Sequence, residues 1–170
     1  MSSSKTKGTA EKTSEPRGAA HPDMSTMEGM AGYMIRIVQI QMFQAFFDQF
    51  KPKGLSAGVF SALVAIRDNP GIKQGVLGTA MLIKRANMTK LISGLQKRGL
   101  VERRVPENDR RAIELHLTRK GSDMLGDVFL EAYEHDHATL NCLSAEEKKQ
   151  FFVMLGRISA DLREQSNWAS

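Results

Sequence analysis

One expected helix, over residues 84–98, has a surface suited to binding a polyanion. Its apolar positions recur every three to four residues and so share one side: Met88, Leu91, Ile92 and Leu95. The opposite side is small, polar and basic, and it carries no acidic residue: Arg85, Ala86, Thr89, Lys90, Ser93 and Lys97. A helix that enters the major groove of DNA needs this character, because it must not repel phosphates and needs donors that reach base edges. A solvated surface helix is the alternative, but such helices usually mix acidic and basic residues.

A second group with recognisable chemistry is Asp109, Arg110 and Arg111, at the tip of an expected β-hairpin. Arginines at a loop tip beside a groove-binding helix can enter the adjacent minor groove, where negative potential is concentrated. Asp109 would then orient Arg111 through an ion pair or a hydrogen bond. Asp109 can also simply cap the turn, and the two roles are compatible.

The distribution of charge supports an anionic partner for this part of the chain. The 170 residues carry a net charge of +5, but residues 73–120 hold twelve basic and four acidic side chains, a net charge of +8. Residues 121–170 carry a net charge of −5. A basic excess confined to one segment favours a polyanionic partner, although an ordinary solvated face has the same composition.

Other classes of protein are disfavoured by what the sequence lacks. We find no glycine-rich phosphate loop, no paired metal ligands and no nucleophile with a plausible base, so we expect neither an enzyme nor a cofactor. His135 and His137 are two residues apart on an expected helix and point to nearly opposite sides, so they do not predict a metal site. No apolar run is long enough to span a bilayer and no secretory signal is recognised, so a cytoplasmic location is expected.

Cys142 is the only cysteine, which excludes an internal disulfide and fits a reducing compartment. A thiol redox sensor is one interpretation of this residue. Nothing strongly cationic lies close to it in the sequence, so we favour a structural cysteine.

The elements that must position these groups follow from periodicity and capping residues. Residues 1–28 are polar and are expected to be a flexible tail. A broad apolar face predicts a helix over residues 30–50, and Ser56 can cap the next helix. A short helix over residues 74–81 should turn Val76, Leu77 and Ala80 inward.

Beyond the helix over residues 84–98, Gly99 suits a left-handed helix end. Two short strands are expected over residues 100–104 and 112–117, and Thr118 can cap a long helix that runs to about residue 140. Ser144 and Glu147 form a capping box for the last helix, whose apolar positions are spaced by four, three and four: Phe151, Leu155, Ile158 and Leu162. The expected fold is mostly α with one β-hairpin.

These motifs together resemble the MarR family of winged helix-turn-helix transcription regulators. The spacing from Leu77 to Gly99 is similar to the family's helix-turn-helix. The run from Gly99 to Arg103 is similar to its first wing strand, and Asp109-Arg110-Arg111 with Leu115 to Gly121 is similar to its wing and the start of the following helix. The resemblance covers about residues 30–162. Gly78 and Gly94 depart from the family pattern, and each should cost about 1 kcal/mol relative to alanine.

The resemblance implies a homodimer built from the first and last helices, which the apolar stripes of those helices also suggest. It implies a pseudo-palindromic DNA operator, with half-sites about one helical turn apart. By domain, residues 29–54 and 122–165 would form the dimerisation region, and residues 55–121 the DNA-binding lobe. By position, contacts from the recognition helix would come from Lys84, Arg85, Ala86, Asn87, Thr89, Lys90 and Ser93. Wing contacts would come from Asp109, Arg110 and Arg111.

Family members commonly release DNA when a small molecule, often an aromatic acid, binds between the dimer helices and the DNA-binding lobe. Apolar and aromatic residues with one cation could line such a cavity for a hydrophobic anion: Tyr33, Arg36, Ile40, Phe43, Phe47, Phe60 and Val64. Plain core packing with a solvated Arg36 is the alternative. Residues 33–37, with Lys51 and Lys53, are also similar to the subgroup that senses hydroxycinnamoyl-CoA thioesters such as p-coumaroyl-CoA. A winged-helix module that binds only proteins is a further alternative.

Overall fold

The computed structural model describes residues 22–105 and 113–165. Most of the expected N-terminal tail lies outside these residues, and so do Asp109, Arg110 and Arg111 of the expected hairpin tip. The chain divides into two units, residues 1–36 and 37–170. In the first, the described part holds the helix α1 (Ser25–Glu28) and the beginning of α2.

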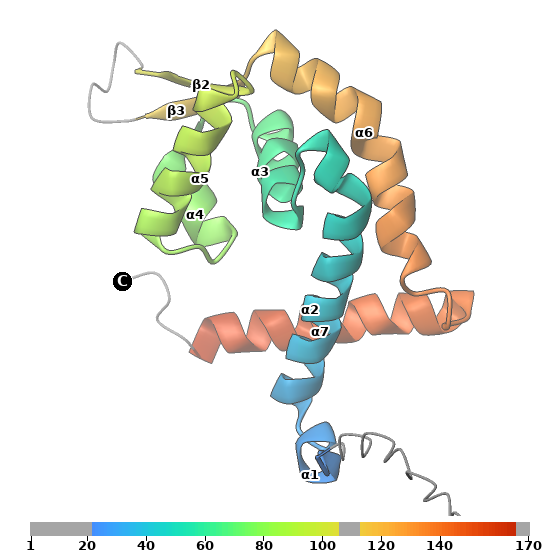
Figure 1. The fold of residues 1–170 in the computed structure, drawn as a ribbon. Coiled ribbons are helices and arrows are strands. Elements are labelled where there is room, and N and C mark those ends of the chain that lie inside the picture. The colour runs from blue at the N-terminus through green and yellow to red at the C-terminus, as the bar shows by residue number, and fades with distance from the viewer. Residues whose placement is uncertain (1–21, 106–112, 166–170) are drawn as a thin grey trace, which may run out of the picture. The chain divides into compact units, whose positions relative to one another are not determined.

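The described elements follow the expected order with three additions: the short helix α1 within the expected tail, a 3-10 turn and a short strand (Figure 1). They are α2 (Ala31–Phe50), η1 (Lys51–Lys53), α3 (Ala57–Asp68), β1 (Ile72–Lys73), α4 (Gln74–Ala80), α5 (Arg85–Lys97), β2 (Val101–Arg104), β3 (Glu114–Leu117), α6 (Arg119–Ala138) and α7 (Ala145–Gln165). The expectation of a mostly α fold with one β-hairpin is therefore confirmed.

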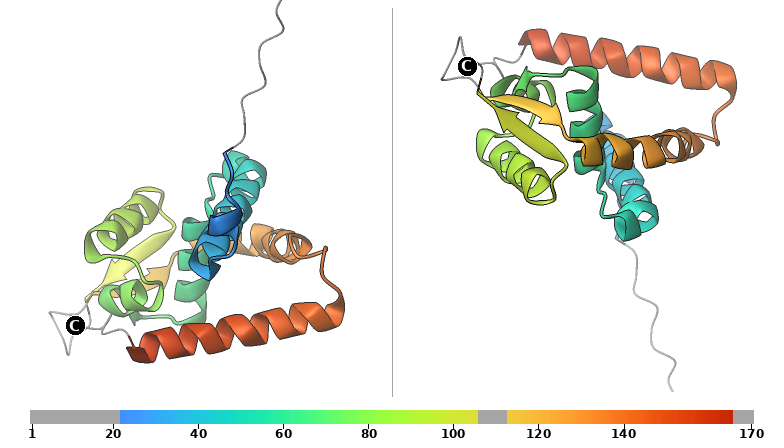
Figure 2. Two further views of the ribbon diagram at one scale, coloured as in Figure 1. Left: turned by 90° about the horizontal axis from the view of Figure 1, so that it is seen from below. Right: turned by 90° about the horizontal axis from the view of Figure 1, so that it is seen from above.

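The hairpin strands belong to a three-stranded antiparallel sheet with the order β1-β3-β2. Val101 pairs with Leu117 on one side of β3, and Ile72 pairs with Leu115 on the other. Strand β1 was not predicted, because two residues after a turn show no alternation that could be recognised. In both views of Figure 2 the yellow strands lie against the yellow-green helix α5, so the wing strands and α5 form one lobe.

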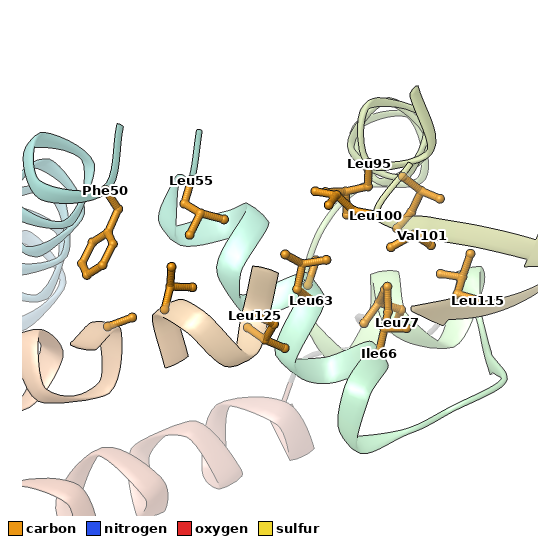
Figure 3. Close-up of a cluster of buried hydrophobic side chains, with 14 of the residues drawn as sticks. Phe50, Leu55, Leu63, Ile66, Leu77, Leu95, Leu100, Val101, Leu115 and Leu125 are labelled. Atoms are coloured by element: carbon orange, nitrogen blue, oxygen red, sulfur yellow. The ribbon is translucent and has the colours of Figure 1, made fainter. Parts of the chain in front are cut away.

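The core joins α3, α4, α5, α6 and the sheet through large apolar side chains (Figure 3). Leu63 and Ile66 of α3 are fully buried, and Val59 and Phe60 are partly buried against them. Leu115 of β3 and Leu125 of α6 complete the cluster from the other side. Each of these elements thus contributes one apolar side to a common core.

Helix α4 turns a different side inward from the one that was predicted. Leu77 is buried as expected, but Val76 is 56% exposed and Ala80 is exposed. Gly78 and Met81 face the core instead, and with Leu77 they centre the buried side about a quarter-turn away from Val76 and Ala80. In a helix of seven residues, one large buried side chain is enough to set the orientation.

Helix ends follow the predicted capping residues. The Ser56 hydroxyl accepts from the Val59 N–H at 3.4 Å, and the Thr118 hydroxyl accepts from the Gly121 N–H at 3.0 Å. The Ser144 N–H donates to the Glu147 carboxylate at 2.8 Å, and the Glu147 N–H donates back to the Ser144 hydroxyl at 3.3 Å. These bonds hold the pKa of Glu147 below its ordinary value, first through the Ser144 side chain and then through its backbone. All three predicted caps are confirmed.

The end of α5 and the start of α6 meet at the residues between α5 and β2. The Thr118 hydroxyl donates to the Gly99 carbonyl at 2.6 Å, and Lys120 Nζ donates to the Arg98 carbonyl at 2.9 Å. Gly99 has a φ of 69°, in the left-handed region where glycine is favoured. A Cβ on Gly121 would lie 2.0 Å from the Leu100 carbonyl oxygen, so α6 can start here only with glycine at that position.

The outer helices leave large apolar surfaces uncovered within one chain. No residue of α7 is buried, and its exposed apolar residues include Phe152, Met154 and Leu162. Ile40 and Phe43 of α2 are about half exposed, at 48% and 52%. A search of the described helices finds none with the length and apolar character of a membrane span.

Substituting Gly121 tests the tight approach of α6 to Leu100. Gly121→Ala should lower the free energy of unfolding by about 3 kcal/mol, because the added methyl group meets a backbone oxygen that cannot move aside. Denaturant unfolding followed by circular dichroism measures this. Gly126→Ala, on the same helix, is the matched control. Its Cβ would meet nothing within 4 Å, so it should instead add up to about 1 kcal/mol. Equal effects of the two substitutions would contradict the packing described here.

Candidate nucleic-acid interface

Helix α5 presents the polar and basic side that the sequence predicted. Met88, Ile92 and Leu95 are at most 1% exposed and anchor the helix in the core. On the other side, six of the seven residues selected for the recognition helix are exposed and Ser93 is half-buried: Lys84, Arg85, Ala86, Asn87, Thr89 and Lys90. The amphipathic pattern thus places all seven toward one outer surface.

A tight corner between α4 and α5 sets how far this surface projects. The Ile83 N–H donates to the Gly78 carbonyl at 2.9 Å, and Leu82 adopts a left-handed φ of 52°. A Cβ on Gly78 would lie 3.4 Å from the Ile83 carbonyl oxygen and 3.6 Å from Met88 Cγ, so the two helices approach closely at this residue. The corner is therefore closed by a backbone hydrogen bond and by the absence of a side chain at Gly78.

The positive charge of α5 is not neutralised within the described chain. None of the ion pairs found among the described residues includes Lys84, Arg85, Lys90 or Lys97. The first turn of the helix also lacks an acidic residue, which would normally be favourable beside the positive end of the helix dipole. This surface therefore attracts anions.

Two residues that the sequence analysis did not select link α5 to the wing. Gln74, the first residue of α4, donates through Nε2 to the Thr89 hydroxyl at 3.1 Å. Arg103 of β2 donates through Nη2 to Gln74 Oε1 at 2.9 Å. Gln74 is 15 positions from Thr89 and 29 positions from Arg103 in the sequence, so no local pattern could have revealed these contacts.

The wing itself is described only along its strands. Arg104, near the end of β2, forms an ion pair with Glu102 on the same strand. The predicted contact residues Asp109, Arg110 and Arg111 lie outside the described residues, so their role in DNA binding stays a prediction.

A hollow of about 400 Å³ lies along one flank of α5. Apolar and polar side chains line it together: Val59, Asn87, Lys90, Leu91, Gly94, Leu95 and Arg98. A Cβ on Gly94 would meet nothing within 4 Å, so the missing side chain helps to keep the hollow open. Since Asn87 and Lys90 also belong to the polar outer side of α5, we treat the hollow as part of the same interface.

The residues selected for effector binding are only partly brought together. Tyr33 and Arg36 belong to the first unit of the chain, while Ile40, Phe43 and Phe47 are exposed further along α2.

Phe60 and Val64 of α3 are half-buried in the core. The Phe60 ring packs against Phe46, with centroids 5.6 Å apart, and against Phe129 at 6.1 Å. Phe46 lies on α2 between the selected Phe43 and Phe47, and unlike those two it is buried.

The histidines and the cysteine do not form a metal centre in the described chain. No group of three or more potential metal ligands was found among the described residues. His135 lies edge-on to Phe46 and Phe50, at centroid distances of 6.1 and 5.7 Å, while the His137 ring is 4.3 Å from that of Tyr133. Cys142 is exposed in the turn after α6, so it does not pack in the core as a structural cysteine would.

Comparisons with known proteins agree on one family. The model described as "MarR family" matches residues 53–112. The transcriptional repressor MprA of Escherichia coli K12 is 30% identical over 136 residues, which cover 79% of this chain and 77% of MprA. A putative transcriptional regulatory protein for the hcr operon of Thauera aromatica is 29% identical over 134 residues, covering 78% of this chain and 81% of that protein.

Solved structures show the same fold. The transcriptional repressor CouR, bound to a 23-mer DNA duplex, superposes with a TM-score of 0.75 at 28% identity and covers 82% of this chain and 99% of CouR. The PcaV regulator of Streptomyces coelicolor, in complex with its natural ligand, has a TM-score of 0.71 at 21% identity, covering 84% of this chain and 98% of PcaV. At that identity the second likeness concerns the fold alone.

Gly94 is predicted to lower the stability of α5 without a packing benefit. Gly94→Ala should raise the free energy of unfolding by about 1 kcal/mol, because alanine restricts the unfolded chain and its methyl group points into open space. Thermal and denaturant unfolding measure the change. Gly99→Ala is the opposite control, since its φ of 69° is strained for alanine, and it should destabilise. A destabilising Gly94→Ala would show that the glycine is required by the folded structure.

Proposed function

The chain belongs to the MarR family of winged-helix, DNA-binding transcription regulators, and we propose that it is a homodimeric repressor that leaves its operator when an aromatic acid or its CoA thioester binds. The observation that carries the DNA-binding part is the outer side of α5. It is exposed, basic and polar, and in the described chain no carboxylate pairs with its cations.

We infer two modes of DNA contact from this arrangement. Lys84, Arg85 and Lys90 would meet phosphates or guanine edges, and Asn87 and Thr89 would meet other base edges in the major groove. Asp109, Arg110 and Arg111 would extend the contact to the minor groove from the wing. The lobe formed by residues 55–121 would thus read one half-site.

The exposed apolar surfaces of α2 and α7 support a homodimer. Large side chains such as Phe43 and Phe152 are about half exposed in one chain, and association with a second copy would remove them from water. Residues 29–54 and 122–165 would form this dimerisation region. A two-fold symmetric dimer would bind a pseudo-palindromic operator. CouR, which has a similar fold, is bound to a DNA duplex, so it supports the fold and the kind of partner.

Repression and release by a ligand rest on the relatives. MprA and CouR are repressors, and PcaV holds its natural ligand. In this chain an aromatic anion would lie against Tyr33, Arg36, Ile40, Phe43, Phe47, Phe60 and Val64.

For a CoA thioester the basic residues Lys51 and Lys53 were the expected phosphate partners. Lys53 forms an ion pair with Glu131, which leaves Lys51 as the more available cation of the two. The same contact, followed by the hydrogen bond from Gln49, holds the pKa of Glu131 below its ordinary value. A CoA phosphate at Lys53 would therefore have to compete with a carboxylate that stays ionised.

The salt dependence of DNA binding tests the proposed interface. Lys90→Ala should lower the slope of log K against log salt by about 1 per bound subunit, because one phosphate contact and its released counterion are lost. Fluorescence anisotropy with DNA from upstream of the protein's own gene measures the slope. Lys149→Ala, on exposed α7, is the matched control and should leave the slope unchanged. Salt-insensitive binding, or none above the nonspecific level, would favour a protein-interaction module instead.

Titration of the DNA complex with p-coumaroyl-CoA and with free p-coumarate tests the effector. We expect one of them to release the DNA, and Arg36→Ala to raise the effector concentration needed by about tenfold, because a charge-assisted hydrogen bond is lost. Arg163→Ala, near the end of α7 and outside the proposed DNA and effector sites, should behave as wild type. Release by neither compound would rule out this effector class while leaving the DNA-binding proposal intact.

A further inference from the structure

Gln74 lies at the centre of a directed chain of hydrogen bonds. Arg103 Nη2 donates to Gln74 Oε1 at 2.9 Å, and Gln74 Nε2 donates to Thr89 Oγ1 at 3.1 Å. The Thr89 hydroxyl then donates to the Arg85 carbonyl, one turn back along α5, at 2.9 Å. The chain therefore runs from the wing strand β2, through the start of α4, to the outer side of α5.

The direction of every bond follows from which groups can donate. A guanidinium has no acceptor, so the Gln74 atom that faces Arg103 must be the carbonyl oxygen. The Gln74 NH₂ group is thereby turned toward Thr89, whose oxygen accepts. The single hydroxyl proton of Thr89 is then left for the Arg85 carbonyl, and no second proton remains for a base.

These bonds select the orientation of the Thr89 side chain. In a helix, threonine divides its population between two rotamers, and the bond to the carbonyl four residues back favours one of them. Thr89 is exposed, and both bonds of its hydroxyl are directed to protein atoms. The hydroxyl proton is therefore committed within the protein, and the oxygen keeps one lone pair. The methyl group is the apolar part of this side chain that an external partner can contact.

The hydrogen bond from Arg103 stabilises the position of the Gln74 side chain. The Arg103 side chain is partly buried, and its Nε is shielded from solvent without a hydrogen-bond partner. None of the ion pairs among the described residues includes Arg103, and its guanidinium donates instead to the amide oxygen of Gln74. Moving Gln74 away would leave a half-buried guanidinium with fewer partners, which is unfavourable.

We propose that Gln74 is a positioning residue that holds the Thr89 methyl group outward, so that Thr89 recognises the 5-methyl group of a thymine in the major groove. Thymine is the base that presents a methyl group there, and an apolar contact with it distinguishes the T·A pair from the others. The inference rests on the proposed function, because it assumes that α5 enters the groove. It adds one base identity and the residue that sets it.

The experiment begins with full-length wild-type protein and a library of random-sequence DNA duplexes. Bound duplexes are enriched, and each dT of the preferred sequence is then replaced singly by dU, which removes only the methyl group. We expect one dT in each half-site where the replacement weakens binding by about fourfold, the value of one buried methyl group. Anisotropy titrations measure this thymine preference for each variant.

Three variants separate the methyl group, the hydroxyl and the positioning amide. Thr89→Val loses the hydroxyl, but valine is confined to one strongly preferred rotamer in a helix and carries a methyl group at both branch positions, so it should retain the fourfold preference without Gln74. Thr89→Ser keeps the hydroxyl but has no methyl group, so it should lose the preference. Gln74→Ala should reduce the preference toward one while affinity for nonspecific DNA stays near wild type. Gln150→Ala, on α7, is the control and should keep the full preference. A merely structural role for Gln74 would lower all DNA binding together and leave the ratio of dT to dU affinity unchanged.

The outcomes distinguish this inference from the proposed function. Specific, salt-dependent binding with a thymine preference that survives Thr89→Ser or Gln74→Ala overturns the inference alone. The same is true of binding that is unaffected by every dU replacement. Failure of the wild-type protein to enrich any sequence overturns the proposed function, and the inference with it.

Discussion

The start of helix α6 lies against the Leu100 carbonyl, at a distance that only glycine at position 121 permits. Thr118 strengthens this contact, because its hydroxyl caps α6 and also donates to the carbonyl of Gly99. The end of α5, the start of β2 and the start of α6 are thereby joined within a few residues. The outer side of α5 and the wing strands keep a common orientation because both are tied to this junction. Helix α6 begins at the same junction and is followed by α7.

The surface of α5 that is proposed to bind DNA is unfavourable in the free protein. Cations at the first turn of a helix oppose its dipole, and α5 begins with Lys84 and Arg85 and has no acidic residue there to offset them. Its cations find no carboxylate partner in the described chain. Phosphates would supply the missing negative charge, so the same arrangement that weakens the isolated lobe favours its complex with DNA. In the free protein, burial of Met88, Ile92 and Leu95 holds the helix against the core.

The long helices α2 and α7 each leave apolar side chains exposed. Helix α7 buries none of its side chains, and the aromatic side chains of α2 divide between the core, where Phe46 and Phe50 stack, and the exposed positions Phe43 and Phe47. These exposed surfaces indicate that a partner covers them. Because hydrophobic burial is non-directional, they do not define the orientation of that partner. Burial against a second copy of the chain, as proposed above, would give the exposed surfaces a common explanation.

Local signals in the sequence determined the helices, their caps and the polar side of α5. Periodicity and capping act over three or four residues, so they can be recognised without the fold, as with Ser56, Thr118 and the Ser144–Glu147 box. The tertiary structure alone decided the pairing of β1 with β3, the exposure of Val76 and the link from Arg103 through Gln74 to Thr89. These features join residues far apart in the chain or depend on which side of a short helix packs inward. Such contacts form only when the whole core assembles, and for that reason no local pattern contains them.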